Sequence, residues 1–276
     1  MSEEDADAMR LARRIAAAFS PLPGVEAVAL GGSQSGGRVD RDSDIDLYVY
    51  TTSAIPLPDR EAIVARLGAV RPELNQTFWD VGDVWHDAET GIEVEAVYWR
   101  TTWIEGMLDR VLVQHRPGNG YSTCHWYTIR NSVCLFDRRG WFAALQERSR
   151  QPYPEELRRA IIAWNHPVLR KITPSYRNQI AKAIRRRDSV SVNHRLTELL
   201  AGYFDVLFAL NRVLHPGEKR LLDLAAERCA KIPANMRTQV EKVLQAAPSA
   251  SPTLLAAVDE LLGGLDRLLL AEGFEA

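Results

Sequence analysis

Two aspartates, Asp44 and Asp46, stand two residues apart where a polar stretch gives way to an apolar run. Residues two apart in an extended strand project from the same face, so both carboxylates point the same way. Neighbouring carboxylates repel each other unless a cation neutralises them, and hard divalent cations such as Mg²⁺ prefer oxygen ligands. The pair therefore predicts a metal site at the start of a strand.

A glycine-rich stretch lies before this pair. Residues 25–30 form an apolar run that predicts a buried strand, and Gly31, Gly32 and Ser33 follow it directly. Glycines allow backbone N–H groups to approach a phosphate closely. A phosphate-binding turn beside paired carboxylates predicts metal-assisted phosphoryl or nucleotidyl transfer.

Gly32-Ser33, a ten-residue spacer and Asp44-Ile45-Asp46 together resemble the GS…DxD signature of the DNA polymerase β-like nucleotidyltransferases. That superfamily includes the kanamycin and streptomycin nucleotidyltransferases and the minimal nucleotidyltransferases. The resemblance implies that Gly32 and Ser33 bind the β- and γ-phosphates of a nucleoside triphosphate. It also implies that Asp44 and Asp46 hold one or two Mg²⁺ ions.

A second acidic strand is predicted at residues 92–98, where glutamates alternate with apolar residues. Glu93 and Glu95 share the face opposite Val94 and Ala96. The superfamily keeps its third carboxylate in this strand, and Glu95 fits the pattern best, although Glu93 matches the context of the streptomycin enzymes. The third carboxylate would be a metal ligand or the general base towards an acceptor hydroxyl. Alternatively, both glutamates face solvent and have no role in catalysis.

Composition and net charge indicate which classes of protein fit this chain. The chain has 276 residues, 46% of them hydrophobic and 25% charged, which is typical of a globular protein of two domains. Its net charge of −2 gives no general attraction to nucleic acid and argues against a polymerase or a dedicated tRNA enzyme. The arginines at residues 185–187 form a local basic cluster, which leaves a nucleic-acid acceptor open.

Three cysteines, at residues 124, 134 and 229, are odd in number and do not show the spacing of a zinc site. The acidic N-terminus differs from the basic start of a signal peptide, and no apolar run is long enough to span a bilayer. We therefore expect a soluble, cytoplasmic protein. The excess of arginine over lysine and the abundant alanine suggest a GC-rich bacterial genome.

The motif Gln151-Pro-Tyr-Pro154 is the best candidate for a domain boundary, because nearly all strand-like patterns precede it. We expect an α+β fold. A polymerase β-like nucleotidyltransferase domain, with a small mixed sheet and flanking helices, would occupy residues 1–150, and an all-α bundle would occupy residues 151–276. Within the first domain, residues 75–84 are expected to be an irregular stretch that enters a strand near Val84-Trp85. Helices of the bundle are predicted at residues 155–164, 176–186, 192–214, 217–229, 235–245 and 253–271.

Two further stretches contain candidate binding residues. Residues 121–131 are aromatic and polar at once, so Tyr121, His125, Trp126 and Arg130 could stack on a base or sugar, although a partly buried helix explains them as well. Pro216-Gly217 is expected to open a helix whose first turn places Lys219 near the triphosphate, although a capped helix start with exposed charges explains this segment equally well. These stretches resemble an uncharacterised bacterial family of nucleotidyltransferases with a DUF4037-type C-terminal helical domain.

The sequence thus predicts a Mg²⁺-dependent nucleotidyltransferase that moves a nucleoside monophosphate, with AMP from ATP favoured, to a hydroxyl of a small molecule and releases pyrophosphate. An aminoglycoside-like antibiotic is one such acceptor. A protein or tRNA acceptor, as in toxin–antitoxin systems, is the first alternative. A nucleotide-binding regulator without catalysis is the second, but a binding module has no need of two repelling carboxylates.

Overall fold

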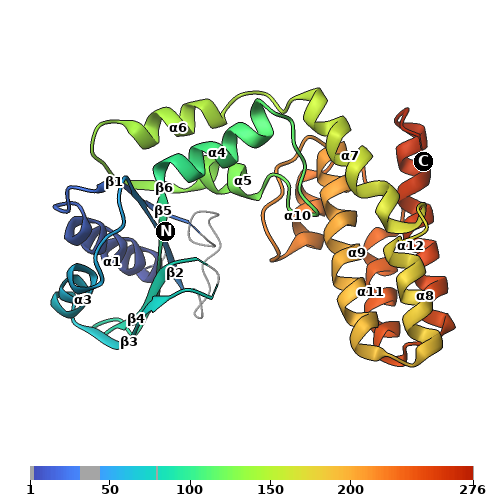
Figure 1. Cartoon of the computed structure of the whole chain (residues 1–276), viewed down its shortest axis with the longest axis horizontal. Helices are drawn as coiled ribbons and strands as arrows, with labels where there is room; N and C mark the ends of the chain where they lie inside the picture. The colour runs from blue at the N-terminus through green and yellow to red at the C-terminus, as the bar shows by residue number, and fades with distance from the viewer. Residues whose placement is uncertain (1–2, 32–43, 79, 276) are drawn as a thin grey trace. The chain divides into compact units, whose positions relative to one another are not determined.

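The computed structural model describes residues 3–31, 44–78 and 80–275 (Figure 1). The chain divides into two compact units. The first comprises Met1–Leu108 and His125–Gln151, and the second comprises Asp109–Cys124 and Pro152–Ala276. The sequence suggested two uninterrupted segments meeting after residue 150, whereas the packing assigns the segment Asp109–Cys124 to the second unit.

The first unit is built on a six-stranded sheet with the order β3-β4-β5-β2-β1-β6. Its strands are β1 (Val25–Leu30), β2 (Ile45–Thr51), β3 (Ala69–Gln76), β4 (Gly82–Asp87), β5 (Glu93–Arg100) and β6 (Val133–Asp137). Only the pair β2–β5 is parallel among the described strands; the other pairs are antiparallel. The expected mixed sheet is therefore confirmed.

One face of this sheet forms the core of the unit. Ile45, Leu47 and Val49 alternate along β2 and are completely buried. They join a hydrophobic cluster with α1 (Glu3–Phe19) and α3 (Leu57–Arg66). Burying each such side chain contributes about 1.5–3 kcal/mol, so the register of β2 is strongly fixed. The residues between them, Asp46 and Tyr48, must then project from the opposite face.

That opposite face is covered at one end by helices. These are α4 (Thr101–Leu112), α5 (Cys124–Asn131) and α6 (Trp141–Ser149). Tyr50 of β2 stacks on Phe142 of α6 with a ring separation of 5.1 Å, and Trp99 at the end of β5 contacts Trp103 of α4 at 5.1 Å. Along β2, β5, β4 and β3, the same face forms the wall of a cavity.

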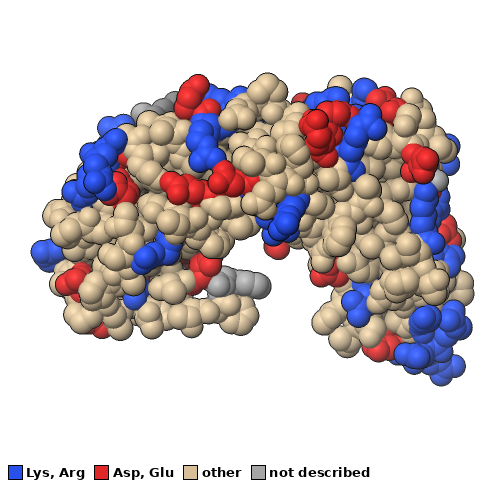
Figure 2. All heavy atoms as spheres, turned by 45° about the horizontal axis from the view of Figure 1, so that its top comes forward, with Lys and Arg blue, Asp and Glu red and all other residues tan. Residues whose placement is uncertain are grey.

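The second unit is a helical bundle, as predicted. Its helices are α7 (Glu155–Arg170), α8 (Tyr176–Arg186), α9 (Ser189–Leu210), α10 (Leu221–Arg228), α11 (Met236–Ala246) and α12 (Pro252–Ala271), with a short 3₁₀ turn η1 (Ala247–Ser249). The central helix α9 begins earlier than residue 192 because Asp188 caps it, accepting a hydrogen bond from the Ser191 N–H. Lys182 and the arginines at 185–187 are exposed at the end of α8, and Figure 2 shows basic side chains gathered there.

One sequence-based expectation is right in part and another is wrong. The strand expected near Val84-Trp85 is β4, which begins at Gly82, but β3 extends to Gln76 within the stretch that was expected to be irregular. The helix expected from Gly217 begins instead at Leu221, and Arg220 before it is left-handed with φ +59°. None of the helices in the described residues is long and apolar enough to cross a membrane.

Candidate active site

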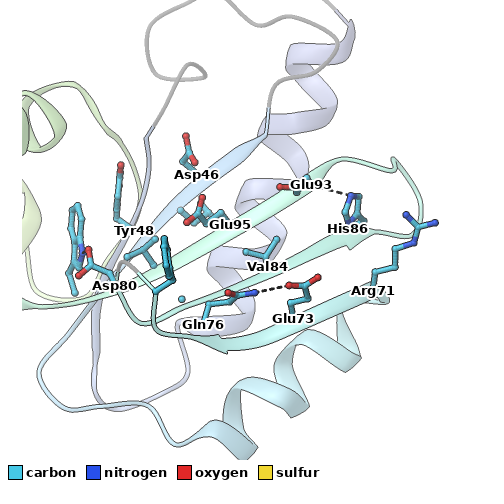
Figure 3. Close-up of a pocket in the computed structure, with 15 residues that line it drawn as sticks. Asp46, Tyr48, Arg71, Glu73, Gln76, Asp80, Val84, His86, Glu93 and Glu95 are labelled. Carbon is cyan, nitrogen blue, oxygen red and sulfur yellow. Dashed lines mark hydrogen bonds and ion pairs between the residues drawn. The ribbon is translucent and has the colours of Figure 1, made fainter. Parts of the chain in front are cut away.

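A cavity of about 750 Å³ lies over four adjacent strands of the sheet (Figure 3). Its floor leaves room for a ligand because Gly82 has no side chain and Val84 and Val97 are small. Polar side chains from β2, β5, β4 and β3 surround this floor. Five of the lining side chains are carboxylates (Asp46, Glu73, Asp80, Glu93 and Glu95), and one is an arginine, Arg71.

Asp46 and Glu95 lie directly opposite each other on the parallel strands β2 and β5. Their neighbours Leu47 and Ala96 are also paired and completely buried on the other face. Adjacent strands lie about 4.8 Å apart, so the two half-buried carboxylates come from neighbouring positions on one face. Figure 3 shows both side chains on the cavity side of the sheet.

Asp44 lies immediately before β2 and is half-buried. The alternation of burial continues through it, since Ile45 is buried and Asp46 is half-buried, and Asp44 therefore belongs to the cavity side. One step back from the Ile45–Val94 pair, Asp44 is level with Glu93.

Glu93 and Glu95 differ in their surroundings. Glu93 is exposed, and its Oε2 lies 3.4 Å from Nε2 of His86 on β4. Glu95 is half-buried. It is level with Asp46, whereas Glu93 is level with Asp44 and contacts His86.

The donor atoms available at this place suit a hard cation. Asp44, Asp46 and Glu95 offer carboxylate oxygens only, which is the ligand type that Mg²⁺ prefers. Across residues 3–31, 44–78 and 80–275, no three His, Cys, Asp or Glu side chains are gathered closely enough to hold a metal ion. The donor chemistry therefore fits Mg²⁺, but the side chains of Asp44, Asp46 and Glu95 do not converge on one point.

The glycine-rich segment begins beside Asp46. The N–H of Gly31 donates to the backbone carbonyl of Asp46 at 2.8 Å. A Cβ atom on residue 31 would lie 2.2 Å from Cε2 of Tyr48, which is far closer than any real contact. Gly32 and Ser33, the predicted phosphate-binding residues, follow directly in the chain and lie outside the described residues.

Tyr48 is itself held in place from the other side. Its ring stacks on Trp99 at 4.4 Å with an angle of 18° between the planes. The indole Nε1 of Trp99 donates to Oδ2 of Asp80 at 2.9 Å. Tyr48 and Trp99 thus form an aromatic wall that closes one end of the cavity and fixes the start of the glycine-rich segment.

The remaining candidates from the sequence do not line this cavity. Trp126 is buried and donates to the carbonyl of Ser149 at 2.7 Å, so it is a core residue. His125 packs edge-on against Trp103, and Tyr121 belongs to the second unit. Lys219 also belongs to that unit and is exposed in the turn before α10, outside the helix.

The contribution of β3 and β4 to the cavity was not expected from the sequence. Arg71, Glu73 and Gln76 come from β3, and His86 comes from β4. A strand was expected near Val84-Trp85, but its buried positions are Asp83 and Trp85 and its half-buried ones are Val84 and His86, so the residue types do not reveal which face lines the cavity. No comparable alternation exists in β3, whose pairing with β4 is irregular twice.

One family model and one solved structure are similar to this chain. A model of the family described as "Domain of unknown function (DUF4037)" matches residues 123–221, which agrees in part with the resemblance seen in the sequence. A crystal structure of a nucleotidyltransferase-like protein from Exiguobacterium sibiricum 255-15 is similar over 95% of this chain and 74% of that chain, with 12% identity and a TM-score of 0.44. No curated protein matches the chain.

Proposed function

We propose that the protein is a metal-dependent nucleotidyltransferase that moves a nucleoside monophosphate, with AMP from ATP favoured, to a hydroxyl of a small acceptor and releases pyrophosphate. The observation that carries this proposal is the pairing of Asp46 with Glu95 on the cavity face. Gly31, where the glycine-rich segment begins, is hydrogen-bonded to the backbone of Asp46. Carboxylates and a phosphate-binding turn at one place suit nucleotidyl transfer better than hydrolysis by a nucleophilic side chain.

In this proposal, Asp44 and Asp46 hold Mg²⁺, and Glu95 is a third ligand or takes the proton of the acceptor hydroxyl. When bound, Mg²⁺ would neutralise the charge that develops on the transferred phosphate. Gly32 and Ser33 bind the β- and γ-phosphates through backbone N–H groups and the hydroxyl. The acceptor oxygen then attacks the α-phosphorus, the bond to the bridging oxygen breaks, and pyrophosphate leaves.

The order of the strands supports separate places for donor and acceptor. The glycine-rich segment follows β1, the aspartates are on β2, Glu95 is on β5, and the cavity continues over β4 and β3. Attacking and leaving oxygens lie roughly in line across the phosphorus in phosphoryl transfer. With pyrophosphate on the β1 side, the acceptor hydroxyl belongs on the side of β5 and β4, beside Glu95.

The size of the cavity supports a small acceptor, because sites for small molecules typically measure about 300–1,000 Å³. Its carboxylates would attract amino groups, as in an aminoglycoside-like acceptor, whereas the single arginine of the lining, Arg71, would attract an acidic group. The exposed basic side chains at the end of α8 favour the second candidate, transfer to tRNA or another polyanionic acceptor. RNA binding that weakens steeply with salt would support that candidate.

The test is calorimetric titration of each nucleoside triphosphate with Mg²⁺ into the wild type and into Asp46→Asn. We expect one nucleotide to bind in a metal-dependent way and the variant to lose this binding. Glu61→Gln, on the exposed side of α3, is the matched control and should bind like the wild type. Pyrophosphate release is then measured with hydroxylated acceptors. Near-normal turnover by Asp46→Asn would contradict the proposal.

A further inference from the structure

The charges in the cavity are not evenly distributed. Asp46 and Glu95 lie on β2 and β5, whereas Arg71 and His86 lie on β3 and β4 and are neighbours in Figure 3. The side chain of Arg71 forms no hydrogen bond or ion pair with another described residue. Nδ1 of His86 is buried and has no hydrogen-bond partner in the described part of the chain. At this end of the cavity, the guanidinium of Arg71 and Nδ1 of His86 are therefore without hydrogen-bond partners among the described residues.

An irregular backbone directs Arg71 into the cavity. Val70 pairs with His86 and Glu73 pairs with Val84, so both Arg71 and Pro72 stand opposite the single residue Trp85. This is a β-bulge, and Arg71 has a left-handed φ of +51°. Regular alternation from Val70 would send the guanidinium to the buried face; the bulge places it among the residues that line the cavity.

The second left-handed residue of β3 is held by hydrogen bonds of its backbone and side chain. Asn75 has φ +59°, its N–H donates to Asp83 at 2.8 Å, and its Oδ1 accepts from Arg60 at 3.0 Å. The left-handed backbone of Arg71 belongs to the bulge, which turns the side chain of this residue towards the cavity.

We propose that Arg71 and His86 form an anion subsite that binds a carboxylate or phosphate group of the acceptor, an inference that rests on the proposed nucleotidyl transfer. Arg71 lies on the third strand from β2, about 14 Å from Asp46 by the spacing of strands. The donor's phosphates belong at the opposite side of β2, next to β1. The acceptor is therefore a small acidic molecule whose hydroxyl reaches Glu95.

The neighbouring carboxylates are not paired with Arg71. Glu93 is paired with Nε2 of His86, and Glu73 accepts a hydrogen bond from Nε2 of Gln76 at 2.7 Å. The guanidinium of Arg71 can therefore present two parallel N–H groups to an incoming anion, the geometry in which arginine binds carboxylate and phosphate best.

The first test needs no nucleotide. Inorganic phosphate is titrated into the full chain, and the side-chain NMR signals of arginine Nε and histidine are followed. We expect Arg71→Gln to weaken phosphate binding at least tenfold, whereas Arg100→Gln, an exposed arginine at the end of β5, leaves it unchanged. Phosphate binding that survives in Arg71→Gln overturns the subsite. Displacement of the phosphate by ATP assigns the subsite to the donor and overturns it as an acceptor site.

The second test uses transfer activity with acceptors that share one hydroxylated skeleton and differ in a carboxylate, phosphate, amide or amine. We expect the acidic members to be used best, and Arg71→Gln to raise their KM at least tenfold while the Kd for Mg-ATP stays within twofold. Preference for the amine, with no effect of Arg71→Gln, overturns the proposal. If no nucleotide is transferred to any acceptor, the proposed function fails, and the phosphate titration still decides whether Arg71 binds anions.

Discussion

The ring of Tyr48 occupies the space that a side chain on residue 31 would need. Tyr48 follows Asp46 by two residues on the same face of β2, and Gly31 is the first residue of the glycine-rich segment. The ring therefore links the position of the metal-binding strand to the start of the predicted phosphate-binding turn. The stack of Tyr48 on Trp99 fixes the ring from behind.

Gly31→Ala should weaken nucleotide binding. Its Cβ would lie 2.2 Å from the Tyr48 ring, so the ring must leave the stack with Trp99 or the backbone of residue 31 must move. Overpacking of this kind costs about 1–3 kcal/mol, and we expect the Kd for the Mg-nucleotide to rise about tenfold. Calorimetry on the folded variant measures the effect.

Two substitutions of Tyr48 test whether the ring, rather than its hydroxyl, does this positioning. Tyr48→Phe keeps the stack on Trp99 and should bind nucleotide within about twofold of the wild type. Tyr48→Leu loses the flat ring and should resemble Gly31→Ala. Equal nucleotide binding in all three variants would show that Tyr48 has no part in positioning the glycine-rich segment.

Glu95→Gln should lower turnover far more than Glu93→Gln. Glu95 is level with Asp46, whereas Glu93 is exposed and paired with His86. Loss of a general base or metal ligand reduces kcat by about 10²–10⁴-fold, while removal of an exposed ion pair has little effect. The rate of pyrophosphate release compares the two variants directly. The reverse order would assign the third carboxylate to Glu93.

A buried ion pair behind the cavity should stabilise the first unit. Arg60 of α3 and Asp83 of β4 are 4% and 0% exposed, and their charged groups lie 2.6 Å apart. Tyr98 donates to the same carboxylate at 2.6 Å. Removing one partner leaves an unpaired buried charge, so Arg60→Met should lower the free energy of unfolding by about 3–5 kcal/mol.

Urea unfolding together with hydrogen exchange of the β4 amides measures this loss where it occurs. Arg66→Met, at the exposed end of α3, is the matched control and should change stability by less than about 0.5 kcal/mol. The double variant Arg60→Met/Asp83→Leu should recover part of the loss, because no buried charge remains. A double variant less stable than the sum of the single changes would contradict this account.

The sequence predicted those parts of the cavity that depend on the alternation of residues along a single strand. Alternation along β2 and β5 placed Asp46 and Glu95 on exposed faces, and the long apolar pattern of α9 indicated the centre of the bundle. The direct pairing of Asp46 with Glu95 depends on the parallel register of two strands distant in sequence. Residue patterns could suggest that these carboxylates meet, but only the fold gives their register.

The strand β3 could not be predicted because its pattern is broken. Its two irregularities each add a residue, so buried and exposed positions lose their period of two. It is also a sheet edge with Pro72 inside, a combination that reads as a loop in the sequence. Arg71 was missed for this reason, since its place in the cavity depends on the bulge itself.

Two buried titratable groups hold the second unit together. Asp205 accepts hydrogen bonds from the N–H and Oγ of Ser122 at 3.0 and 2.6 Å and from Asn165 at 3.0 Å. His215 accepts from the N–H of Gly217 through Nδ1 at 3.2 Å, so the neutral ring has its proton on Nε2. Desolvation by burial raises the pKa of Asp205 to about 6 and lowers the pKa of His215 to about 3.

These shifts give opposite slopes of stability with pH. Between about pH 4 and 6, folded Asp205 retains a proton that the unfolded chain loses, so its contribution falls as pH rises. Below the ordinary pKa of 6.5, His215 binds a proton in the unfolded chain but stays neutral in the folded one. Its contribution to stability therefore falls as pH drops towards 3. The full effect is about 3 kcal/mol for Asp205 and about 5 kcal/mol for His215, and between about pH 4 and 7 the two largely offset each other in the wild type.

Asp205→Asn should therefore make the second unit more sensitive to acid, and His215→Gln should make it less sensitive. Removing Asp205 leaves the histidine slope unopposed, so the fall of Tm between pH 7 and 4 becomes steeper than in the wild type. Removing His215 leaves only the carboxyl slope, which favours the folded state as pH falls. Both variants lose stability at pH 7, so the slope and not the Tm itself is the measurement. His194→Gln, exposed on α9, should keep the wild-type slope. Parallel slopes in all four proteins would show that neither buried group titrates as the structure indicates.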